Sequence, residues 1–202
     1  MDCDILTKKE IGLMMKHYVG VDLEYSLPFM HSPRQSRQRD AGFLHRVYRF
    51  EKPCGTSNVS WRYSGKSDTI NLTVSKPVML HGVQHFGSEG GKNTVSLEVR
   101  TRDGPYFVVS LVKQIDMYSS EKDETNGYYG FDVMFDHSVC LERGKTYETV
   151  SLIQGPSSWR VVRGKYTDEV EGIRFSFSKS STSRNGTDEI RGQFPALLFS
   201  TL

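Results

Sequence analysis

From Leu44 onward, apolar and polar residues alternate with a period of two, and this pattern constrains the fold more than any other feature of the sequence. Five runs of four to eight residues show it most clearly, and they are rich in β-branched and aromatic residues. Their apolar positions are Ile70, Leu72 and Val74; Val95, Leu97 and Val99; Phe107, Val109 and Leu111; Phe131, Val133 and Phe135; and Ile173, Phe175 and Phe177. A period of two places such residues on one face of a strand, so we expect strands with one buried face.

Turn-forming pairs separate these runs. Asp103-Gly104, Asn126-Gly127, Arg143-Gly144 and Asn185-Gly186 fall between them, and such pairs adopt the positive φ angles of tight hairpins, so neighbouring runs should pair antiparallel. The intervening segments show no helical periodicity. The sequence therefore predicts an all-β fold over residues 43–202, an antiparallel β-sandwich, jelly-roll-like, with about ten to twelve strands.

Residues 1–42 follow a different pattern. Thr7 and Glu10 have the spacing of a helix N-terminal capping box, and apolar residues recur at helical spacing behind them. This predicts a short amphipathic N-terminal helix at about residues 8–18. The stretch "SLPFMHSPRQSRQRDAG" that follows is rich in Ser, Pro and Arg and has no periodicity, so we expect a basic linker before the sandwich.

Charge and hydropathy exclude several classes of protein. With 26 Lys and Arg against 24 Asp and Glu, the chain lacks the strong positive field of a nucleic-acid-binding protein. No run approaches the roughly 20 apolar residues that cross a bilayer, and "MDCDILTKKE" is charged from its second residue, unlike a signal peptide. Three scattered cysteines show no metal-ligand spacing. We expect a cytoplasmic protein that binds neither nucleic acid nor membranes.

The glycine-rich stretch "HFGSEGGKNTVSLEVRT" could be a phosphate-binding loop or a corner between two strands. A phosphate loop requires glycine at position 86 and Ser or Thr at position 93, followed by a helix. This chain has Phe86, Asn93 and an alternating strand pattern, which favours the corner. His81 and His85 have no third ligand nearby in sequence. The sequence thus predicts no cofactor, no metal, no catalytic residue and no enzymatic activity.

Several motifs occur together in a specific order. They are Arg49-Phe50, Trp61 with Tyr63, Asp68 with Ile70, Gly82-Val83, the turn 86–91, and the closing stretches "GIRFSF" and "RNGTDEIRGQFPALLF". In this order and spacing, residues 46–200 resemble the PHR domain, the module named for PAM, Highwire and their nematode relative. The upstream stretches "ILTKKEIGLMMKHY" and "SLPFMHSPR" are similar to the end of a BACK region.

The resemblance implies a β-sandwich that captures a protein substrate. In its relatives, the module is attached to a BTB domain that docks on a cullin-3 ubiquitin ligase. Because this chain shows no BTB domain, cullin-3 is expected as a partner only indirectly. The sequence leaves open whether the chain is complete or is the C-terminal part of a BTB-type adaptor. One stretch departs from the family: "SSWRVVRGKYTDEVEG" is unusually basic.

Candidate partner-binding residues are aromatic or arginine side chains in or beside predicted loops, because such side chains bury much area with few rotatable bonds. They are Phe86, Tyr128, Tyr129, Trp159, Arg160 and Arg163. Phe86 and one of the two tyrosines could instead belong to the core. A carbohydrate- or small-ligand-binding jelly roll is the alternative function. Only the acidic stretch 121–126 favours it, and that stretch lacks the spacing of a calcium loop.

Overall fold

The computed structural model describes residues 44–51, 60–103, 106–124, 126–159 and 161–202. The predicted helix at 8–18, the linker up to residue 42 and Arg160 lie outside these residues. The described strands, in chain order, are β1 (His45–Tyr48), β2 (Asp68–Val74), β3 (Val78–Phe86), β4 (Lys92–Asp103), β5 (Tyr106–Ser119), β6 (Glu121–Asp123), β7 (Tyr128–Leu141), β8 (Tyr147–Gln154), β9 (Val161–Val162), β10 (Thr167–Val170), β11 (Ile173–Lys179), β12 (Arg191–Gly192) and β13 (Ala196–Thr201).

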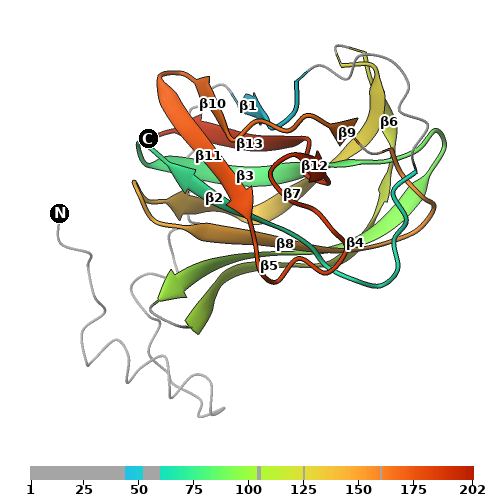
Figure 1. Ribbon diagram of the computed structural model, residues 1–202, viewed down its shortest axis with the longest axis horizontal. Coiled ribbons are helices and arrows are strands. Elements are labelled where there is room, and N and C mark those ends of the chain that lie inside the picture. The colour runs from blue at the N-terminus through green and yellow to red at the C-terminus, as the bar shows by residue number, and fades with distance from the viewer. Residues whose placement is uncertain (1–43, 52–59, 104–105, 125, 160) are drawn as a thin grey trace, which may run out of the picture. The chain divides into compact units, whose positions relative to one another are not determined.

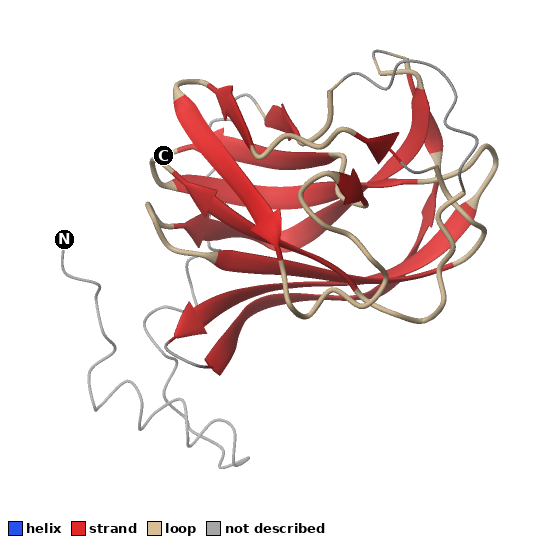
Figure 2. Cartoon of the chain, viewed as in Figure 1, coloured by secondary structure: helices blue, strands red, loops and turns tan. Residues whose placement is uncertain are grey.

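Two antiparallel sheets form the fold (Figure 1). One has five strands in the order β1-β13-β3-β7-β6, and the other has six in the order β10-β11-β2-β8-β4-β5. The short strands β9 and β12 pair with each other outside both sheets. Figure 2 shows strands and loops throughout the described part of the chain, which contains no helix. The predicted all-β sandwich is therefore confirmed.

The core lies between the two sheets, where the alternating apolar residues meet. Ile70, Leu72 and Val74 of β2 are buried, and the predicted apolar positions of β4, β7 and β11 are buried with them. Phe107, Val109 and Leu111 lie in β5, for which the backbone pairing with β4 is described. Alternation thus identified the face of each of these four strands that excludes water.

The predicted turns divide into two kinds. Asp103-Gly104 joins β4 to β5, and Asn126-Gly127 joins β6 to β7, and both pairs are antiparallel as expected. The prediction is wrong for Arg143-Gly144, because β7 and β8 belong to different sheets. Both flanking strands bury apolar side chains toward the same core from opposite sides, Leu141 from one and Tyr147 from the other. Burial therefore determined the partner of each strand here.

Asn185-Gly186 also does not make a hairpin. It lies between β11, which pairs with β2 and β10, and β12, which pairs with β9. The side chain of Asn185 is drawn inward instead, since its Nδ2 donates to a carboxylate oxygen of Asp68 over 3.0 Å.

None of the described residues belongs to a helix that could cross a membrane.

Gly82 allows a close approach between β3 and β7, at a point where the register of the two strands shifts. A Cβ at this position would lie 2.6 Å from the carbonyl oxygen of Val133. Because that neighbour is backbone, we expect Gly82→Ala to lower the free energy of unfolding by about 2 kcal/mol. Urea unfolding measures the change, with the exposed Ser181→Ala as control. A loss no larger than that of the control would contradict this account.

His85 is fully buried in the core, where its ring packs on Phe131 and Phe194. Its Nε2 hydrogen-bonds the Ser151 hydroxyl at 3.1 Å, and burial lowers the pKa of His85 to about 3. An unfolded chain has its histidine pKa near 6.5, so it binds more protons than the folded chain below that pH. This histidine therefore makes folding less stable as the pH falls through about 6.5.

We expect the free energy of unfolding to fall by about 2 kcal/mol from pH 7 to pH 5 because of His85. His85→Gln retains a donor near Ser151 but cannot titrate. Unfolding curves at both pH values for the two proteins isolate the effect, since all other groups are shared. Parallel pH dependence in the variant would assign the loss to other residues.

Candidate functional site

Loops from distant parts of the sequence are joined at the end of the sandwich where β3 finishes, away from the C terminus (Figure 1). The Gly87 amide donates to the Tyr129 carbonyl over 2.8 Å, and the Gly87 carbonyl accepts the Trp159 amide over 3.2 Å. Ser158 and Trp61 exchange two backbone bonds of 2.8 and 3.0 Å. We call this end, formed by residues 86–91, 127–129, 155–159, 161–166 and 186–193, the loop end.

Arg49 is the buried centre of the loop end. Its side chain is 1% exposed, and its guanidinium donates to five backbone carbonyls. These belong to Asp188, Glu189, Arg191, Gln193 and Phe194. Burial lowers the pKa of Arg49 to about 9, which leaves the group charged at neutral pH. One side chain thereby fixes the path of residues 188–194.

Gln193 links that segment to the other loops. Its Oε1 accepts the Phe86 amide over 3.0 Å, and its Nε2 donates to the Ser158 hydroxyl over 2.9 Å. Gln193 is itself fully buried, so both bonds are protected from water. The end of β3 and the start of the 158–166 loop are therefore held by the same side chain.

The buried Asp68 carboxylate binds a second group of loop residues through hydrogen bonds. It accepts hydrogen bonds from the Trp61 indole at 3.3 Å, the Thr187 hydroxyl at 2.6 Å and the Asn185 amide. Burial raises the pKa of Asp68, and these bonds oppose the rise. The sequence motifs around Trp61, Asp68 and Thr187 are thus parts of one buried cluster that supports the loops.

The predicted residues Phe86 and Tyr128 lie inside the protein, 0% and 2% exposed. Their rings pack edge to face with centroids 4.9 Å apart, Phe50 completes the cluster, and Trp159 covers it from outside as a half-buried side chain. The Tyr128 hydroxyl donates to Gln84. Phe86 and Tyr128 therefore lie beneath the surface of the loop end, whereas Trp159 lies at that surface.

Tyr129 and Arg163 reach the surface. Tyr129 is at the start of β7, and a hydrogen bond to Glu89 raises its pKa. Arg163 is exposed and has a φ of 92°, in the region that favours glycine. Its backbone is held there because its amide donates to the Ile190 carbonyl over 2.9 Å. Strain of this kind at an exposed loop residue is typical of binding sites.

Sequence reasoning missed two residues of this surface. Tyr166 is 61% exposed and Ile190 is 45% exposed. Ile190 is a neighbour of Arg163, because the amides of Arg163 and Gly164 both donate to the Ile190 carbonyl, and Tyr166 follows three residues later in the same loop. An isolated isoleucine in the charged turn "DEIRG" was the available signal, but its exposure depends on how two distant loops stack. We call the half-buried Trp159 together with the exposed Arg163, Tyr166 and Ile190 the exposed group.

A hollow of about 500 Å³ lies on the five-stranded sheet and is lined by strands β1, β3, β6 and β7 and by the end of β5. It contains tyrosines and carboxylates, which a carbohydrate site would need. However, the Asp132 carboxylate binds Arg46 through two hydrogen bonds, and the Asp123 carboxylate binds two groups of Asn126. These carboxylates are bound by other groups of the protein itself.

Among the described residues, no three His, Cys, Asp or Glu side chains are grouped as metal ligands.

Comparison with known proteins identifies relatives over most of the chain. The family model described as "PHR domain" matches residues 48–200. BTB/POZ domain-containing protein 6-B of Danio rerio is 30% identical over 199 residues, which is 97% of this chain and 38% of that protein. The human BTB/POZ domain-containing protein 6 is 28% identical over 97% of this chain and 34% of its own length. The human BTB/POZ domain-containing protein 3 is 28% identical over 81% of this chain and 30% of its own length. The chain thus spans about a third of the length of these relatives.

Arg49→Met should destabilise the fold strongly. Methionine fills a similar volume but leaves five carbonyls without their donor, and two of those bonds are fully buried. We expect the free energy of unfolding to fall by about 3 kcal/mol or more. Chemical denaturation tests this, with Arg143→Met in the exposed β7–β8 turn as the matched control. A loss similar to the control's would mean that the carbonyl bonds contribute little.

Proposed function

Because this chain belongs to the PHR domain family, we propose that it is a protein-recognition module that captures a partner through its loop end. The exposed group is the observation that carries this proposal. It offers an indole, a guanidinium, a phenol and an aliphatic side chain on the loops at one end of the sandwich. Aromatic and arginine side chains of this kind provide most of the binding energy at protein interfaces.

Buried contacts beneath the exposed group support the same proposal. Residues 188–194 are fixed by Arg49, and the 158–166 loop is attached to them through Gln193 and through the Ile190 carbonyl. A surface that is already ordered loses little conformational entropy when a partner binds. The loop end therefore suits recognition of a folded or extended protein surface better than chemistry on a small substrate.

We further propose that the module is non-catalytic and works in the cytoplasm as the substrate-recognition part of a ubiquitin-ligase adaptor. The relatives are named as BTB/POZ domain-containing proteins. Alignment over 97% of this chain requires most of residues 1–42 to be included, which supports a BACK-like tail in that segment. Cullin-3 would then be reached only through a BTB domain, and not by the sandwich.

Quantitative affinity capture from cytosol tests the recognition surface. The 202-residue chain is the bait, with Arg163→Gly and Ile190→Ser as separate variants. Glycine adopts the φ of 92° without strain, so Arg163→Gly removes the side chain and leaves the backbone in place. We expect each variant to lose the partners of the parent chain about tenfold, as for a hot-spot residue.

Two variants at the far end of the sandwich serve as controls. Arg143→Gly removes an exposed arginine, and Leu202→Ser removes an exposed apolar side chain that is 72% accessible. Both should capture partners as the parent chain does. Equal recovery by all five baits would exclude the exposed group as the recognition surface. Capture that depends on glycans, and is lost after glycosidase treatment, would favour carbohydrate binding instead.

A further inference from the structure

A second hollow, of about 430 Å³, lies on the outer face of the six-stranded sheet. Its floor is the outward side of β8, where Val150 and Leu152 are half-buried. In the strand register Leu152 lies opposite Ser96 of β4, and Val150 lies opposite Glu98. The residues beside Leu152 are small, since Ser67 and Ser96 line the hollow with it. This part of the sheet face can therefore receive an apolar side chain.

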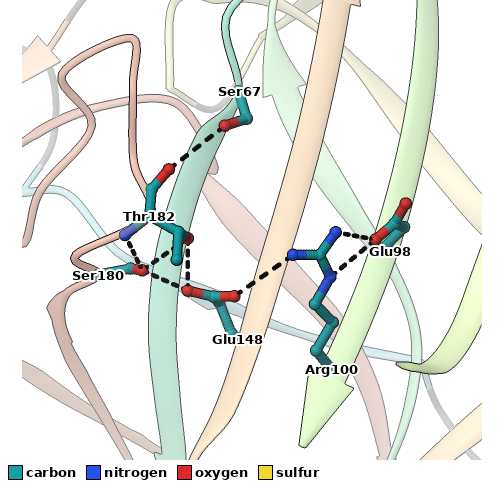
Figure 3. A network of polar contacts seen from close by, with 6 residues as sticks. All are labelled: Ser67, Glu98, Arg100, Glu148, Ser180 and Thr182. Carbon is teal, nitrogen blue, oxygen red and sulfur yellow. Dashed lines mark hydrogen bonds and ion pairs between the residues drawn. The ribbon is translucent and has the colours of Figure 1, made fainter. Parts of the chain in front are cut away.

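A polar network closes one end of this hollow (Figure 3). Glu148 is 0% exposed in its side chain, and its Oε1 accepts hydrogen bonds from the hydroxyls of Ser180 and Thr182. Its Oε2 lies 3.9 Å from Arg100, which also binds Glu98 through two nitrogens. Arg100 is thus shared between two carboxylates, so these three charged groups together carry one negative charge in excess.

The same network positions two further cations at the rim. The Ser67 hydroxyl donates to the Thr182 carbonyl over 3.4 Å, and the Arg184 amide donates to the Ser67 carbonyl over 2.9 Å. Lys66 and Arg184 both line the hollow with exposed side chains. Neither forms an ion pair in the described part of the chain, so their charges remain available to a ligand.

We propose that this hollow binds a short acidic segment of a partner protein, with a central apolar side chain over Leu152 and carboxylates at Lys66 and Arg184. Charge complementarity selects this occupant. Lys66, Arg184 and Arg100 oppose the two carboxylates of Glu98 and Glu148, which leaves one positive charge in excess, and the cations without an ion pair lie at the rim. An apolar floor beside two cations fits a peptide better than a free anion, which would leave the floor empty. This site lies on the sheet face and is independent of the exposed group.

Fluorescence anisotropy with defined peptides tests the proposal on the 202-residue chain. The probe is a fluorescein-labelled peptide of sequence Asp-Glu-Leu-Glu-Asp-Gly. A second peptide replaces its acidic residues with lysine, and a third replaces its leucine with serine. We expect the acidic leucine peptide to bind about tenfold more tightly than either of the others, and to weaken when salt is raised from about 0.05 M to about 0.3 M.

Variants identify the site. Lys66→Glu combined with Arg184→Glu should weaken the probe at least about tenfold, while Arg143→Glu with Lys145→Glu in the distant β7–β8 turn leaves its affinity unchanged. The substituted side chains are exposed, and equal unfolding midpoints verify the fold. Arg163→Gly should also leave the affinity unchanged, which separates this site from the recognition surface.

Three results would overturn the proposal. The first is failure of the acidic leucine peptide to bind more tightly than the other two. The second is an equal loss of affinity in the rim variant and in the turn control. The third is full displacement of the probe by millimolar inorganic phosphate together with equal binding of the serine peptide, which would show a general anion site instead of a peptide site.

Discussion

The bonds from the Arg49 guanidinium to five carbonyls are the interaction on which the loop end depends. A buried charge is costly unless its donors are satisfied, and here the backbone of residues 188–194 satisfies them. The requirement is mutual, because the carbonyls of a turn that cannot pair within a sheet need donors as well. When the Arg49 donors and the turn carbonyls satisfy each other, the backbone of residues 188–194 is fixed in one conformation. Gln193 and the Ile190 carbonyl then connect this segment to the neighbouring 158–166 loop.

Rigidity has a clear use in a module that binds proteins. Backbone hydrogen bonds hold two described parts of this loop, Ser158 through Trp61, and Arg163 with Gly164 through Ile190. Side chains above such a backbone can vary without disturbing the sheets below. Selectivity then depends on a few exposed groups, and the buried cluster beneath them serves any partner equally well. In this protein, the exposed group would select the partner, and the buried residues beneath it hold the loops in place.

Local patterns predicted much of the fold, because strand alternation and turn chemistry are properties of a few adjacent residues. The β2 run around Leu72 and the turn at Asn126-Gly127 were found in this way. Assignment of strands to sheets was not predictable at Arg143-Gly144, since it depends on which core each strand joins. The resemblance to PHR domains was confirmed over residues 48–200. The exposed residues of the loop end were harder to predict from the sequence. Phe86 is buried and Ile190 is exposed because of how loops from distant parts of the sequence pack together.

The pairing of β1 with β13 joins the first described strand to the last. Arg49 likewise, just after β1, finds its acceptors some 140 positions later. During synthesis on the ribosome, the N-terminal half of the sandwich therefore emerges without the partners that complete it, and long-range pairing of this kind closes slowly. The five-stranded sheet cannot be completed before β13 has been made, because β13 pairs with both β1 and β3. A nascent chain that stalls before that strand presents an open sheet to chaperones and proteases.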